Sequence, residues 1–192
     1  MDCKLSFFIT FLFLTVSFCS AQLTTTNEAP YDTEEYLVND VLLGADLVTS
    51  NFSSIGYFNG QITDLGVSNA DGIGYFDGTL SNIGFEEGVI LSSGGLGMVS
   101  GEGGGGSFLG PTEADLQLAL TEINLGGNVQ NVTVLEFDFI AESETVTFNY
   151  VFGSSEYSDY TCSQYNDIFG FFLSGPGING IYSNNAVNIA RI

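Results

Sequence analysis

The stretch Thr145-Val-Thr-Phe-Asn-Tyr-Val-Phe152 is the clearest strand signal in the chain. Its even-numbered side chains are all apolar, and most of the odd-numbered ones are polar. Because successive side chains of a β-strand point to opposite faces, this alternation predicts a strand with one buried face. Three neighbouring apolar segments, Val132–Ile140, Ile168–Leu173 and Val187–Ile192, indicate further strands of the same core.

The rest of the sequence also predicts mainly strands. From Val41 onward, short apolar stretches alternate with Gly, Asn, Asp or Ser roughly every 8 to 12 residues, which is typical of all-β domains. The segment Ile55–Gly60 recurs as Ile73–Gly78, and both copies end in an Asn-Gly or Asp-Gly turn that favours a hairpin. Only Pro111–Ile123 has helical spacing. We therefore expect an all-β fold, an antiparallel β-sandwich with jelly-roll character and one short helix.

The charge of the chain excludes several classes of function. Among 192 residues, 23 are acidic, two are basic and none is histidine, which gives a net charge of −21. Catalysis by Ser-His-Asp or Cys-His and zinc sites built on histidine cannot be assembled from this chain alone. The basic residues Lys4 and Arg191 lie at the two ends, so nothing neutralises a phosphate backbone and nucleic acid is excluded as a partner. A binding module, a structural domain or an enzyme that uses only carboxylates remains.

The first 21 residues have the pattern of a secretory signal peptide. Lys4 precedes an apolar and hydroxyl run from Leu5 to Phe18, and small side chains come just before Gln22. A run of about 14 residues is shorter than the roughly 20 that span a membrane, so we expect no transmembrane segment after cleavage. The sequence thus predicts a secreted or cell-surface protein with a signal peptide at 1–21, a polar acidic lead-in at 22–40 and a β domain at 41–192.

The cysteines leave alternatives open. A lipoprotein leader would use Cys19, although the bulky Phe18 before it disfavours that processing. Cleavage of the leader leaves only Cys162, in an oxidising compartment where thiols usually pair. Cys162 is then a free thiol, or its partner lies in another chain or beyond Ile192. Because the sequence stops inside an apparent strand, we expect the domain to be incomplete at its C-terminus.

Six segments follow one another in a recognisable order. They are Gly88-Val-Ile-Leu-Ser-Ser-Gly94, Ala114-Asp-Leu116, Val134-Leu-Glu-Phe-Asp-Phe139, Val146-Thr-Phe-Asn-Tyr-Val-Phe152, Ser155-Glu-Tyr157 and Tyr165-Asn-Asp-Ile-Phe-Gly-Phe-Phe-Leu-Ser-Gly-Pro176. This order resembles the choice-of-anchor L domain, a family that occurs in exported, surface-associated and often modular proteins of the Bacteroidetes. The resemblance implies a β-rich surface module without established catalysis, whose relatives continue further and end in a sorting segment for type IX secretion or another anchor.

A polar loop between two apolar segments is the main candidate for a metal site. It carries four side chains with oxygen ligands, Glu156, Asp159, Asn166 and Asp167. Calcium takes six to eight oxygen ligands from loops of this kind, so these four residues are predicted metal ligands. The spacing differs from that of an EF-hand, and a solvated acidic loop is the alternative. No other cofactor is expected.

Two further constellations support alternative functions. Carboxylates at Glu136, Asp138, Glu142 and Glu144 suggest a glycosidase pair, but strand alternation places the first two on one face that we expect to be solvated. For the aromatic pairs Tyr57-Phe58 and Tyr75-Phe76 we expect packing in the core, and stacking on sugars is the alternative.

Together these observations predict a non-catalytic extracellular or cell-surface interaction module, serving adhesion or matrix assembly and stabilised by calcium. Its ligand would be a surface glycan or a protein. The alternative is a carbohydrate-binding module or a carboxylate-based glycosidase.

Overall fold

The computed structural model describes residues 23–44, 47–58, 61–63, 72–100, 113–123, 126–154, 160 and 167–190, and at 55–58 and 61–63 it describes the backbone only. The predicted signal peptide, Cys162 and most of the predicted metal loop lie outside these residues.

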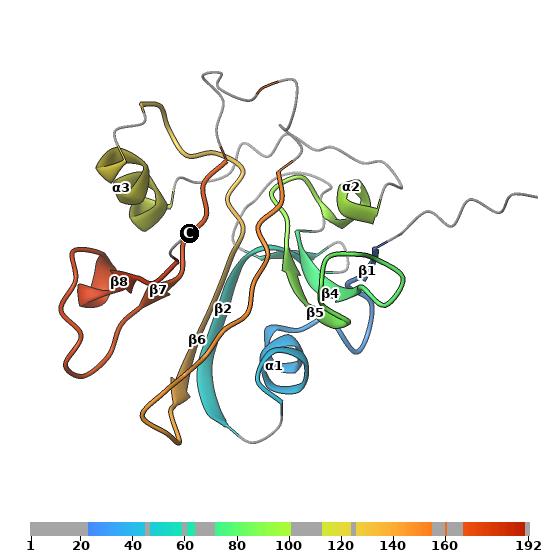
Figure 1. Cartoon of the computed structure of the whole chain (residues 1–192), viewed down its shortest axis with the longest axis horizontal. Coiled ribbons are helices and arrows are strands. Elements are labelled where there is room, and N and C mark those ends of the chain that lie inside the picture. The colour runs from blue at the N-terminus through green and yellow to red at the C-terminus, as the bar shows by residue number, and fades with distance from the viewer. Residues whose placement is uncertain are drawn as a thin grey trace, which may run out of the picture.

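The described strands form antiparallel sheets joined by a few short helices, which confirms a mainly β chain. Three sheets are present in this part of the chain, with strand orders β1-β4-β5, β3-β2-β6 and β7-β8. In the view of Figure 1, β2 and β6 lie between the first sheet and the β7-β8 pair. The strands are β1 (Thr24–Thr26), β2 (Val48–Phe58), β3 (Gln61–Thr63), β4 (Ile73–Asp77), β5 (Glu87–Leu91), β6 (Val134–Ile140), β7 (Phe172–Leu173) and β8 (Val187–Asn188).

The helices are short. The predicted helix is present as α3 (Ala114–Glu122), whose first turn is capped by the Glu113 side chain. Three further helical segments were not expected from the sequence: α1 (Glu34–Tyr36), which continues into a π-helix at Leu37–Leu42, α2 (Leu96–Ser100) and a 3₁₀ turn at Ser183–Asn185. Within the described residues, we find no helix with the length and apolar character needed to cross a bilayer.

The segment before residue 41, expected from its polarity to be a lead-in, contributes to the fold. Thr24–Thr26 pairs with β4, and the Thr25 hydroxyl donates to the carbonyl of Leu96 in α2. The helical segment buries Leu37 and Val38 completely. Leu37 packs against Ile73 of β4, so this acidic stretch is attached to the sheet by apolar packing as well as by the pairing of β1.

A second core lies beside α3. Leu120 from the helix packs against Val129 and Val132, just before β6 begins. Ile168, from the predicted core segment near the C-terminus, is packed against the same cluster. This cluster places α3 and the segment that follows residue 167 next to the start of β6.

The ladder between β2 and β6 is interrupted by a bulge, which lies in β2. Ser50 pairs with Asp138 and Ser53 with Glu136, so β2 has one extra residue between these pairs. Asn51, within the bulge, adopts a φ of 54°, a left-handed conformation that asparagine tolerates better than most residues.

The strand predicted at 145–152 is not formed, and Figure 1 draws the segment as an orange tube without an arrow. None of the backbone hydrogen bonds between described residues joins Val146–Asn149 to a neighbouring strand. The apolar side is also not fully buried, because Val146 is 39% and Phe152 41% exposed. Alternation reports which side chains share a face, and it carries no information about a partner strand.

The longer strands predicted at 168–173 and 187–192 are short as well. Only β7 and β8, two residues each, form a ladder there.

We predict that Leu37→Ala destabilises the protein by about 2–5 kcal/mol, because it removes a fully buried side chain that packs on Ile73. The free energy of unfolding in urea measures this effect. The matched control is Leu80→Ala, at a leucine that is 73% exposed, with an expected change within about 0.5 kcal/mol. Equal losses in the two variants would contradict this assignment of the core.

Candidate functional site

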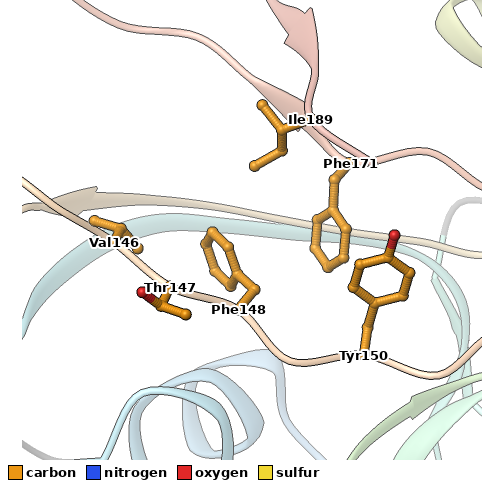
Figure 2. Close-up of a pocket in the computed structure, with 6 residues that line it drawn as sticks. All are labelled: Val146, Thr147, Phe148, Tyr150, Phe171 and Ile189. Carbon is orange, nitrogen blue, oxygen red and sulfur yellow. The ribbon is translucent and has the colours of Figure 1, made fainter. Parts of the chain in front are cut away.

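An open groove lies between the 145–152 segment and the two strands near the C-terminus. Its volume is about 240 Å³. Figure 2 shows the rings of Phe148, Phe171 and Tyr150 along it, with Ile189 across from Thr147. We call it the aromatic groove, and its lining residues are Val146, Thr147, Phe148, Tyr150, Phe171 and Ile189.

Ring contacts hold the two sides of the groove together. The rings of Phe148 and Phe171 are stacked with centroids 5.4 Å apart and planes 22° apart. Tyr150 meets Phe171 edge-on at 5.7 Å. Phe152 stacks on Phe169 at 5.8 Å, so the two segments oppose one another in antiparallel order. Each such pair contributes about 0.5–1.5 kcal/mol beyond its area burial.

The C-terminal side of the groove is fixed by main-chain contacts. The amide of Ile189 donates to the carbonyl of Phe171 at 2.7 Å, and the Phe171 amide donates to Oδ1 of Asn188 at 3.1 Å. These bonds extend the register of β7 and β8, in which Phe172 faces Asn188. Phe171 and Ile189 are therefore placed by a short ladder, and Phe148 packs against them.

Apolar side chains in and beside the groove remain partly exposed to solvent. Four of them are more than a third exposed, namely Val146, Tyr150, Phe152 and Ile189. A gathering of exposed apolar groups on one surface is typical of an interaction site.

The structure describes only one of the four predicted metal ligands. Asp167 is exposed and accepts a short hydrogen bond from the Ser154 hydroxyl, which joins the two ends of the predicted loop. Glu156, Asp159 and Asn166 lie outside the described residues. No group of three or more Asp, Glu, Cys or His suited to a metal occurs among the residues that are described. The calcium site thus stays a prediction.

The carboxylates of β6 point to solvent, as alternation predicted. Glu136 accepts a hydrogen bond from the Ser53 hydroxyl at 3.1 Å, and Asp138 accepts one from Nδ2 of Asn51 at 2.6 Å. Both carboxylates are exposed, and so are Glu142 and Glu144 after the strand. The row of polar groups therefore crosses the β2–β6 pair on its wet face.

Comparison with known proteins identifies the family. The family model described as Choice-of-anchor L domain matches residues 24–192. This chain belongs to the choice-of-anchor L domain family. No curated protein and no solved structure matches it. Family membership places the chain among secreted or surface-associated proteins.

The choice-of-anchor L match starts at β1 and so includes the acidic segment before residue 41. It also spans every residue of the aromatic groove. The alternation at 145–152 predicts that Val146, Phe148 and Tyr150 share one apolar face, but it assigns that face to a buried core. Nothing in the sequence indicates that this face stays partly exposed and lines a groove with Phe171 and Ile189.

In this choice-of-anchor L domain, core packing of the Tyr75-Phe76 pair is confirmed, and these two rings do not form the alternative sugar platform. Phe76 is buried, and the Tyr75 ring stacks on Tyr31 at 4.2 Å, nearly parallel at 18°. The Tyr75 hydroxyl donates to Glu87 at 2.8 Å. Both rings therefore pack within the fold, on the central strand of the sheet β1-β4-β5. The side chains of Tyr57 and Phe58 lie outside the described residues.

Burial raises the pKa of Tyr75 from 10.0 to about 12, and the hydrogen bond to Glu87 adds to the rise. The folded state therefore favours the neutral phenol, and its contribution to stability is complete below pH 10 and is lost as the pH rises to about 12.

We predict that the difference in unfolding free energy between the wild type and Tyr75→Phe shrinks over this alkaline range. Urea titrations at a series of pH values measure the difference. Leu80→Ala, at an exposed side chain that does not titrate, is the control, and its difference from the wild type should stay constant over this range. A difference that stays constant from below pH 10 to pH 12 would contradict the role of the Tyr75 hydroxyl.

Proposed function

We propose that this choice-of-anchor L domain is a non-catalytic interaction module of the cell surface that serves adhesion or matrix assembly. The aromatic groove is its contact face. The single observation behind this proposal is the concentration of half-exposed apolar side chains around a groove whose walls are fixed by stacked rings. The fold that carries the groove is, in this proposal, an antiparallel β-sandwich of jelly-roll type, exported through the signal peptide at 1–21.

A carbohydrate-binding module or a carboxylate-based glycosidase is the second candidate. The observation that favours it is that a tyrosine ring and the Thr147 hydroxyl both line the groove, since sugars stack on aromatic faces and take hydrogen bonds from polar side chains nearby. Binding on a glycan array without turnover would support the lectin-like version. Hydrolysis that is lost in Glu136→Gln or Glu142→Gln would overturn the non-catalytic assignment.

We predict that Val146→Thr combined with Ile189→Thr weakens attachment of the producing cells roughly tenfold. Each substitution removes apolar surface worth about 0.8 kcal/mol per buried methyl group. Val146→Thr keeps the shape of the side chain, whereas Ile189→Thr also shortens it by one methyl group. The measurement is the fraction of cells retained under flow, normalised to the amount of protein on the surface.

The matched control for this experiment is Val48→Thr combined with Ile181→Thr, at side chains that are 63% and 61% exposed and lie outside the groove. We expect the control cells to attach like the wild type. Equal attachment of groove-variant and wild-type cells would contradict the proposed contact face.

We also propose that the loop at 154–167 binds calcium. Calcium at 100 times its Kd would stabilise the fold by about 2.7 kcal/mol, so it should raise the melting temperature. Asp167→Ala and Glu156→Ala should each abolish the shift, whereas Glu142→Ala, at an exposed carboxylate after β6, should leave it intact. A melting temperature that does not respond to calcium or to a chelator would rule out the site.

A further inference from the structure

We propose that the aromatic groove binds the arginine side chain of a basic segment in a partner protein. This inference rests on the proposed function, because it names the chemistry of the partner for the same contact face. It draws on the size of the groove, on its ring lining and on the charge around it.

The size of the groove suits one side chain. Its volume of about 240 Å³ is below the roughly 300–1,000 Å³ of pockets that enclose a small-molecule ligand. A long, unbranched side chain can lie along such a groove with its apolar stem against Val146 and Ile189. We therefore assign the occupant to a partner protein that inserts a side chain.

The lining of the groove suits a cation that is weakly hydrated and flat. Three of its six lining residues are aromatic, Phe148, Tyr150 and Phe171, and Tyr150 meets Phe171 at 63°, so their faces point in different directions. Aromatic faces attract cations, and arginine is found on them more often than lysine because guanidinium is planar and gives up its water more easily.

The charge around the groove also favours a basic partner. Exposed Glu144 lies two residues before Val146, and Asp167 is held at Ser154, two residues after Phe152. Carboxylates therefore flank the ring contacts at both ends of the 145–152 segment. The net charge of −21 attracts a basic segment from a distance and opposes association with a second copy of this chain.

The test uses the full chain and three synthetic peptides of equal length that differ only in one repeated position, which is arginine, lysine or glutamine. Fluorescence anisotropy gives each Kd at low and at physiological salt. We expect the arginine peptide to bind about tenfold or more tightly than the glutamine peptide, with lysine between them and with weaker binding at higher salt.

Two variants test whether the arginine peptide binds in the aromatic groove. Phe148→Leu keeps an apolar side chain but removes a ring, and it should weaken arginine binding about fivefold or more. Phe139→Leu, at a half-buried phenylalanine of β6 outside the groove lining, is the matched control and should bind like the wild type. Circular dichroism of both variants shows whether the fold is retained.

Three results would overturn the inference. These are equal binding of the arginine and glutamine peptides, unchanged arginine binding by a folded Phe148→Leu, and dimerisation of the chain alone in sedimentation experiments. If Val146→Thr and Ile189→Thr still reduce cell attachment in any of these cases, the interaction role stands and only the arginine chemistry fails. If attachment is also unaffected, the proposed function fails with it.

Discussion

The stacking of Phe148 on Phe171 is the contact on which the candidate site depends. It joins a segment that has no strand partner among the described residues to a short ladder that is fixed by main-chain hydrogen bonds. Packing of side chains therefore holds this segment in place, whereas backbone hydrogen bonds between strands hold the other sheets together. The groove exists because these rings meet each other and still leave part of their surface to solvent.

The acidic composition and the groove fit one kind of role. A high net charge keeps a surface protein soluble and limits which partners can approach, whereas affinity comes from desolvated apolar and aromatic contacts. The exposed carboxylates on β6, hydrogen-bonded to Ser53 and Asn51, belong to the wet face of the sheet. The partly exposed apolar side chains that line the groove lie elsewhere, around Phe171.

The sequence predicted which side chains lie together better than it predicted backbone pairing. Alternation at 145–152 correctly placed Phe148 and Tyr150 on one side, and helical spacing found α3. The sequence could not show that Leu37 packs on Ile73, because two adjacent apolar residues in an acidic stretch form no periodic pattern of hydrophobicity. Core packing of Tyr75 and Phe76, which the sequence favours, is confirmed, although the sequence does not reveal that Tyr31 covers the Tyr75 ring. The family was recognised from segment order, which survives such local errors.

A double-mutant cycle between Phe148→Ala and Phe171→Ala tests this account most directly. The free energies of unfolding of the wild type, the two single variants and the double variant give the coupling between the rings. A stacked pair predicts a coupling of about 0.5–1.5 kcal/mol. Additive losses, with a coupling near zero, would show that the two rings do not meet and that the groove is not built as described.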